Sequence, residues 1–321
     1  MPFKWKRSYT FACRDKTGVH MSMENRLSRA TLALAAGLSI WALALGAAQA
    51  QTFEVKQNMP VESSFVRYLP ADIKSRGTIN AATTDANAPW SFVDQKSGAP
   101  QGVDVDLVND AAKRLGLTVN WSVIQFTAGI PGVQSGRYDL YVSAMADTKK
   151  REDVVNFIAY SQEGSGVIVP KGNPKNIKTM NDLCGKHVAI VTGSLFPAII
   201  DDLNKKCSAP VTVSETADQA APYLAVASGQ ADATMNTYGV SNYALKTATE
   251  GIQTQLELSP VTRFAPANQG IAFSKTSTDL MAALAGSMQA MKEDGSYQKI
   301  MDKWNVGDGA MDQFLLNAPL F

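Results

Sequence analysis

Two side chains at predicted strand ends could bind an anion. Arg151 carries a guanidinium, whose planar fork of donors can pair with a carboxylate through two hydrogen bonds. Ser194 follows Gly193 at the start of a predicted helix, where free backbone N–H groups and the helix dipole favour a negative charge. Both residues also have structural interpretations. Arg151 could form a surface ion pair with Glu152 or Asp153, and Ser194 could cap the helix.

Residue types that perform acid–base or metal chemistry are scarce. Of the two histidines, only His187 lies outside the leader described below, and it precedes a predicted buried strand. General acid–base catalysis needs a positioned titratable group, and no carboxylates cluster in the segments expected to line a cleft. The spacing of Cys184 and Cys207 does not fit a zinc site. We therefore expect a protein that is not an enzyme and binds neither metal nor cofactor.

The N-terminus has the pattern of an export signal. Arg26 and Arg29 precede an apolar run over residues 30–48, and Ala48-Gln49-Ala50 has the small residues of a cleavage site. The alternative is an uncleaved anchor helix, but the run is rich in Ala and Gly and no basic stop-transfer cluster follows it. No Cys follows the site, which argues against a lipoprotein. We expect cleavage after Ala50 and release into the periplasm.

Residues 1–20 carry basic side chains without a periodic pattern, so translation could start at Met21 or Met23. Residues 51–321 contain 23 Lys and Arg against 27 Asp and Glu, a net charge of about −4. This balance gives no electrostatic footprint for nucleic acid or anionic lipid. The 271 residues are enough for two modest lobes, each with its own core.

Cys184 and Cys207 are the cysteines left in this part of the chain. An even pair in an oxidising compartment indicates one disulfide, although two buried thiols would also fit. A disulfide here would close a loop of roughly 24 residues and contribute on the order of 3 kcal/mol, mainly through the unfolded state.

Strands and helices alternate from Gly77 onward. Strands are predicted at residues 78–82, 117–123, 139–144, 167–170, 188–191, 211–214, 231–235 and 269–273. Helices are predicted at residues 104–115, 128–136, 195–206, 217–228 and 240–248, with a last long helix capped by Thr276 and Asp279. This order implies an α/β fold whose sheet is mostly parallel and covered by helices on both faces.

Two α/β units followed by a returning segment suggest two lobes joined by two crossing strands, near residues 161–166 and 261–268. We expect the first lobe to contain residues 51–163 and 263–321, and the second lobe to contain residues 164–262. Ligands of open α/β sheets bind at the carboxyl ends of strands, so a cleft between the lobes is the expected site.

Several segments resemble a known family. They include Ala88-Pro89-Trp90, Gly-Val-Asp-Val-Asp-Leu at 102–107, and residues 135–139, 147–152, 182–186, 192–194, 228–233 and 291–297. From about residue 69 to 306 the chain resembles the bacterial extracellular solute-binding proteins of family 3, the polar amino acid type. The resemblance implies a type II periplasmic-binding fold that supplies an ABC importer, with an amino acid or related small carboxylate as ligand, the membrane permease as partner and a monomeric state.

The resemblance also implies roles for particular residues. Arg151 would hold the α-carboxylate of the ligand, and Thr237 stands where relatives usually place an Asp that pairs with the ligand ammonium. Asp85 could supply a negative charge instead, or the ligand could lack an ammonium. The other ligand-binding residues expected are Ser194, Ser143, Met145, Trp90, Asn87 and Phe196. Two alternatives use the same fold: a periplasmic cyclohexadienyl-type dehydratase and a ligand-presenting sensor protein.

Overall fold

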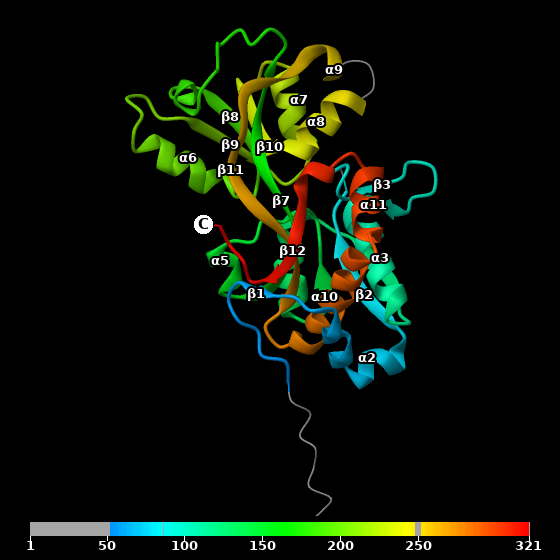
Figure 1. Cartoon of the computed structure of the whole chain (residues 1–321). Helices are drawn as coiled ribbons and strands as arrows, with labels where there is room; N and C mark the ends of the chain where they lie inside the picture. Colours follow the sequence, from blue (N-terminus) through cyan, green and yellow to red (C-terminus); the bar gives the residue numbers. More distant parts are fainter. Residues whose placement is uncertain (1–51, 86, 248–251, 321) are drawn as a thin grey trace, which may run out of the picture. The chain divides into compact units, whose positions relative to one another are not determined.

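The computed structural model describes residues 52–85, 87–247 and 252–320, and residues 52–321 form one compact unit (Figure 1). The described residues contain a ten-stranded mixed sheet that passes through two α/β lobes. The predicted export signal and the alternative start sites lie outside the described residues. No helix within the described ranges combines the length and the apolar character needed to cross a membrane.

Parallel strands form the sheet of the first lobe, in the order β5, β2, β6. These strands are β2 (Thr78–Thr83), β5 (Thr118–Val123) and β6 (Leu140–Tyr141). Helices cover both faces of this sheet. They are α3 (Val103–Arg114), α4 (Gly129–Gln134), α10 (Thr278–Glu293) and α11 (Ser296–Lys303).

Helix α3 forms because its apolar residues recur on one face and its charges match the helix dipole. Leu107, Val108 and Ala111 are buried against the sheet, whereas Asp104 and Asp106 lie in the first turn. The main core of the first lobe lies under α3 and α10, and a smaller apolar cluster lies under α4 on the other face. The sheet is therefore buried on both sides, as the element order predicted.

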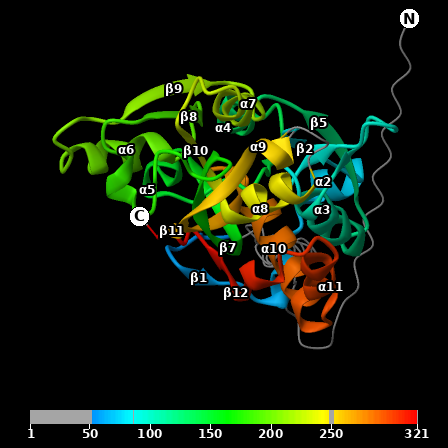
Figure 2. The ribbon, with the colours of Figure 1, turned by 90° about the horizontal axis from the view of Figure 1, so that it is seen from above.

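The second lobe repeats this construction with strands in the order β10, β8, β9 (Figure 2). Its strands are β8 (His187–Val191), β9 (Thr212–Thr216) and β10 (Ala233–Thr237). Its helices are α6 (Phe196–Asn204), α7 (Ala221–Ala227), α8 (Tyr238–Thr247) and α9 (Ile252–Gln255), with the 3-10 turn η3 (Met180–Leu183). Helix α6 packs on one face, and α7 with α8 packs on the other.

Two long strands run through both lobes and pair antiparallel with each other. They are β7 (Val155–Pro170) and β11 (Leu256–Ser274). Their pairing shifts register several times between Leu258 and Gly270, the region in which the chain passes between the lobes. The expectation of a mostly parallel sheet is therefore right within each lobe and wrong at the centre, where β6, β11, β7 and β10 are joined by antiparallel pairings.

Strand β11 joins the predicted crossing strand at residues 261–268 to the predicted strand at 269–273 and begins five residues earlier, at Leu256. Pro260 and Pro266 interrupt the sequence pattern of its first half, and the shifts in register accommodate them. Helix α10 also begins differently from the prediction, because its N-cap is Ser277 and no side chain caps it. Asp279 instead accepts a hydrogen bond from the backbone N–H of Phe53, at 2.6 Å.

Short elements connect and flank the lobes. They are β1 (Met59–Pro60), η1 (Ser63–Tyr68), α2 (Ala71–Arg76), the β3 (Phe92–Val93) and β4 (Pro100–Gln101) hairpin, η2 (Phe126–Ala128), α5 (Lys149–Glu152), η4 (Gly307–Gly309) and β12 (Ala310–Leu316). Strand β12 pairs antiparallel with both β1 and β7. The two ends of the described chain thus meet beside the crossing strands.

Cys184 and Cys207 form a disulfide with 5.4 Å between their Cα atoms, which confirms the predicted pair. Cys184 follows η3 and Cys207 follows α6, so the bond fixes the end of α6 to the segment before β8. Both residues pack against the apolar core of the second lobe.

Replacing Cys184 and Cys207 together by Ser should lower the free energy of unfolding by about 2–4 kcal/mol, because the unfolded chain loses a constraint. Urea denaturation of the exported protein would measure the change. Ligand affinity should stay the same, since neither sulfur lines the pocket described below. Wild-type protein that releases two titratable thiols on denaturation without reductant would contradict the assignment.

Candidate functional site

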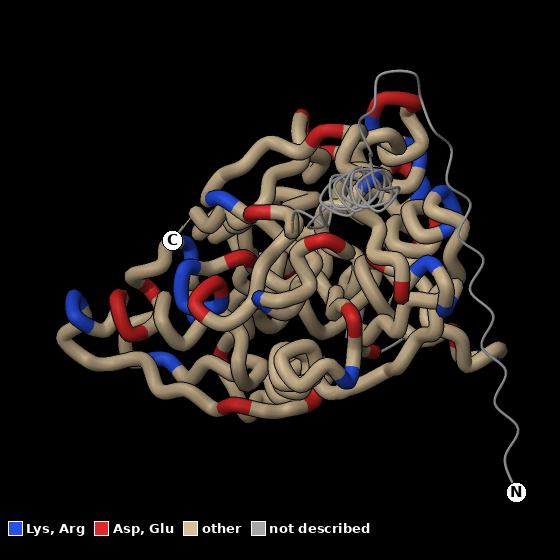
Figure 3. The backbone as a smooth tube through the Cα atoms, turned by 90° about the horizontal axis from the view of Figure 1, so that it is seen from below, with Lys and Arg blue, Asp and Glu red and all other residues tan. Residues whose placement is uncertain are grey.

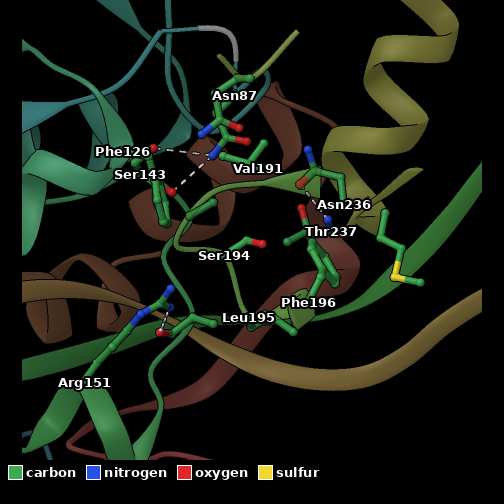
Figure 4. A pocket seen from close by; sticks show the side chains of 14 residues that line it. Asn87, Phe126, Ser143, Arg151, Val191, Ser194, Leu195, Phe196, Asn236 and Thr237 are labelled. Atoms are coloured by element: carbon green, nitrogen blue, oxygen red, sulfur yellow. Dashed lines mark hydrogen bonds between the residues drawn. The ribbon is translucent and has the colours of Figure 1, made fainter. Parts of the chain in front are cut away.

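A pocket between the lobes contains six of the residues predicted from the sequence (Figure 4). Asn87, Ser143 and Arg151 come from the first lobe, and Ser194, Phe196 and Thr237 come from the second. The pocket has a volume of about 50 Å³. Its residues follow the carboxyl ends of strands in both lobes, where the element order placed the ligand.

Arg151 lies on α5, whose first turn is capped by Thr148. The Thr148 hydroxyl accepts a hydrogen bond from the backbone N–H of Arg151, at 3.3 Å. The guanidinium Nη1 donates to the carbonyl of Ala146 at 2.5 Å, and Nη2 donates to the carbonyl of Gly193 at 2.9 Å. Gly193 belongs to the second lobe, so this side chain bridges the two lobes.

Arg151 is a partly buried cation, and no carboxylate in the described part of the chain lies within ion-pair distance of it, although Asp147 acts on its charge from farther away. Burial lowers the pKa of Arg151 to about 10, so the side chain remains charged at neutral pH. The ring of Phe126 lies 5.8 Å from the guanidinium carbon. Two of the five guanidinium donors are bonded to carbonyls, which leaves donors for an anion.

A buried polar network holds the segment after β6. Asn87 Nδ2 donates to the carbonyl of Ser143 at 3.1 Å, and the hydroxyls of Thr84 and Ser143 are 2.5 Å apart. The next residue, Ala144, has a φ of 45°, which is rare for a residue with a side chain. Its N–H donates to the carboxyl of Asp104 at 2.9 Å.

Asp104 thus helps to hold the pocket through its hydrogen bond to the backbone of Ala144, which lines it. Its carboxyl also accepts a hydrogen bond from the hydroxyl of Tyr160, and both side chains are fully buried. Burial raises the pKa of Asp104 to about 7, although the hydrogen bonds from Tyr160 and Ala144 oppose the shift.

The second lobe contributes the turn between β8 and α6. Gly193 has a φ of 76°, and a Cβ there would lie 3.3 Å from Thr127 of the first lobe, so glycine permits both the turn and the close approach. Ser194 does not cap α6, because the N-cap is Leu195 and no side-chain cap bond forms. The Ser194 hydroxyl is instead buried without a hydrogen-bond partner in the pocket (Figure 4).

Thr237 ends β10 and lies directly before α8. Its hydroxyl is buried and forms no hydrogen bond that meets ordinary geometry. It is nevertheless close enough to Glu163 to help lower the pKa of that carboxyl, which burial raises to about 7. Glu163 accepts longer hydrogen bonds from Gly239 N–H at 3.4 Å and from Gln269 Nε2 at 3.2 Å.

Three predicted residues lie outside this pocket. Trp90 is fully buried in the core of the first lobe, with its ring 6.0 Å from that of Tyr160. Met145 is also buried, in the apolar cluster under α4. Asp85 accepts a hydrogen bond from the N–H of Val93 at 2.9 Å and borders a separate surface hollow.

The pocket also contains residues that were not predicted from the sequence. They are Phe126, Ala144, Ala146, Val191, Leu195, Gln219, Met235 and Asn236. Most adjoin a predicted strand end, and the same rule extended by two or three residues would have included them. Gln219 lies in the segment between β9 and α7 and has no comparable signal.

The fold and the pocket together define a solute-binding protein of the type II periplasmic-binding class, in which two lobes enclose a ligand. Residues 79–307 match the model of the bacterial extracellular solute-binding proteins, family 3. The chain belongs to this family.

Relatives of known description agree with this assignment. The arginine-binding protein ArgT of Corynebacterium glutamicum is 30% identical over 78% of this chain and 81% of its own length. The L-cystine-binding protein TcyA of Bacillus subtilis is 26% identical over 73% of this chain and 83% of its own. A solved ancestral arginine-binding protein bound to arginine has a TM-score of 0.64 and 29% identity, covering 71% of this chain and 98% of its own.

Asp104→Asn should change how stability depends on pH. The folded carboxyl keeps its proton up to about pH 7, whereas the carboxyl of the unfolded chain loses it near the ordinary pKa of 3.8. The wild-type free energy of unfolding should therefore fall between pH 4 and pH 7, by up to ~4 kcal/mol from this group. Denaturation at several pH values should show this loss reduced in the variant.

Asp94→Asn provides a control of opposite sign. Hydrogen bonds from the backbone and side chain of Ser97 lower the pKa of Asp94, so its stabilisation is lost as pH falls through the acid range. This variant should affect the acid side and leave the slope between pH 4 and pH 7 in place. Equal slopes in wild type and Asp104→Asn would show that Asp104 does not titrate as described.

Proposed function

We propose that this protein captures an amino acid or a related small carboxylate between its lobes and presents it to the permease of an ABC importer. The observation that carries the proposal is the state of Arg151, a partly buried cation at the pocket with hydrogen-bond donors to spare and no carboxylate of the described residues within ion-pair distance. A charged group that is partly removed from water is stabilised when it binds a partner of opposite charge. The binding of arginine and cystine by relatives fits this class of ligand.

Arg151 can bind a carboxylate more specifically than a lysine could. The planar guanidinium presents two parallel donors to two oxygens, and its position is fixed by the bonds to Ala146 and Gly193. Ser194 adds an unbonded hydroxyl from the second lobe. A carboxylate between them would contact both lobes at once, which favours the closed arrangement.

The proposal includes export through a cleaved signal peptide to the periplasm, and function as a monomer. It includes no role in binding nucleic acid. Basic and acidic residues are interspersed along the described chain in the view of Figure 3, which fits a surface that does not attract polyanions.

We also propose that the protein is not an enzyme. The lining residues, all of them described, include no His, Cys, Asp or Glu that could act as a general acid or base. His187 lies at the start of β8, where its Nδ1 is 2.8 Å from the carbonyl of Gln230. This point needs a test because a solved ancestral amino acid-binding protein, described as a precursor of cyclohexadienyl dehydratase, has a TM-score of 0.64 and 28% identity.

Incubating the exported protein with prephenate or arogenate should give no product above the uncatalysed rate. Absorbance spectroscopy would detect the aromatic products. Turnover that scales with protein concentration, and that disappears in Arg151→Ala, would show that the protein is a dehydratase and would contradict the proposal.

Arg151→Ala should weaken ligand binding by on the order of 2–5 kcal/mol, because the ligand carboxylate would be buried without its partner. Arg151→Lys should recover part of this loss, since an ammonium cannot reproduce the two-donor fork. Isothermal titration calorimetry with the best ligand from a thermal-shift screen would measure both changes.

Lys150→Ala is the matched control. Lys150 is an exposed cation on the same helix and does not line the pocket, so its removal should leave affinity within about twofold. Unchanged affinity in a folded Arg151→Ala protein would place the ligand elsewhere.

A further inference from the structure

The residues that line the interlobe pocket carry one positive charge and no negative charge. Arg151 supplies the cation. The other polar side chains are neutral amides and hydroxyls: Asn87, Ser143, Ser194, Gln219, Asn236 and Thr237. An anion bound to Arg151 would make this set of groups neutral.

The buried acidic groups around the pocket are engaged elsewhere. Asp104 is bonded to Tyr160 and to the N–H of Ala144. Asp147 accepts a hydrogen bond from the N–H of Ala318 at 2.8 Å, on the side of the terminal strands.

Glu163 lies close to the hydroxyl of Thr237, but its carboxyl lines a different hollow and accepts hydrogen bonds from Gly239 and Gln269. Burial raises the pKa of Glu163, as it does for Asp104 and Asp147.

Amino acids and oxo acids differ in what they would add to this pocket. A zwitterionic amino acid brings an ammonium beside its carboxylate, and that ammonium would meet only neutral acceptors close to Arg151. A buried cation without a counter-ion is strongly disfavoured. A 2-oxo or 2-hydroxy acid brings the same carboxylate with a neutral oxygen, which the surrounding amides and hydroxyls can bind.

We propose that the cognate ligand is a small 2-oxo or 2-hydroxy carboxylic acid, without a cationic group next to its carboxylate. This inference rests on the proposed function, because it takes Arg151 as the carboxylate-binding residue. It narrows the ligand from amino acids and related carboxylates to one chemical class. It also gives Thr237 a role. Because this side chain at the end of β10 is neutral, it provides no negative charge to pair with a ligand ammonium.

Calorimetric titration with matched pairs tests the proposal on the exported wild-type protein. The pairs are L-alanine and pyruvate, L-leucine and 4-methyl-2-oxopentanoate, L-phenylalanine and phenylpyruvate, and L-glutamate and 2-oxoglutarate. Each pair keeps the side chain constant and exchanges the ammonium for an oxygen. In the pair that binds most tightly, the oxo acid should bind at least ~10-fold more tightly than the amino acid.

Thr237→Asp should shift this ratio toward the amino acid by at least ~10-fold, because it places an anion where the ammonium would lie. Thr237→Asn has similar size and no charge, so it should leave the ratio within about threefold. Thermal unfolding would establish that both variants fold. The comparison of oxo acids with amino acids on the wild-type protein does not depend on either variant.

The outcomes separate this inference from the proposed function. Equal or tighter binding of the amino acid in the best pair would overturn the inference, while loss of that binding in Arg151→Ala would still support the proposed function. Absence of binding by every member of the four pairs would overturn the inference, and the proposed function would fall with it only if the thermal-shift screen of other amino acids and carboxylates also gave no ligand. Preference for the oxo acid that Arg151→Ala abolishes would support both.

Discussion

The antiparallel pairing of β7 with β11 is the constraint on which the rest of the structure depends. The two strands pair from Val155–Ser274 in the first lobe to Leu256–Pro170 in the second, so both lobes are built outward from one ribbon. Bends at its register shifts can alter the angle between the lobes without breaking either core, because each lobe has its own apolar clusters. The pocket lies where this ribbon brings the two lobes together.

The ends of the described chain stabilise the first-lobe side of that ribbon. Residues 308–320 follow the segment that matches the family model, and β12 within them pairs with β7. Asn317 is bonded to the N–H of Phe157 at 2.8 Å, and Gln57 Nε2 lies 3.3 Å from Glu152. With the bond from Ala318 to Asp147, these contacts hold both carboxyl groups that flank Arg151 along the chain. The segments that directly precede β1 and follow β12 thus help to fix the orientation of α5.

Local sequence patterns predicted much of the fold and part of the site. Helix α3 and strand β2 agree with the prediction because their apolar spacing and flanking glycines are local signals. Residues 256–260 of β11 lie outside the predicted crossing strand at 261–268, because their pairing with β7 is a long-range interaction that local patterns do not show. Met145 lies between the pocket residues Ala144 and Ala146, and Trp90 lies three residues after Asn87, but both side chains point into the core. Sequence proximity could not resolve that direction.

Affinity for a ligand carboxylate and closure of the two lobes can depend on different contacts of the ligand. The guanidinium of Arg151 already spans the lobes through the carbonyls of Ala146 and Gly193. A ligand whose contacts were the same in every lobe arrangement could not shift the equilibrium between open and closed forms. Contacts from the second lobe, such as the unbonded hydroxyls of Ser194 and Thr237, exist for a first-lobe ligand only when the lobes meet. Under the proposed function, a carboxylate on Arg151 favours the closed form to the extent that it also contacts these neutral groups.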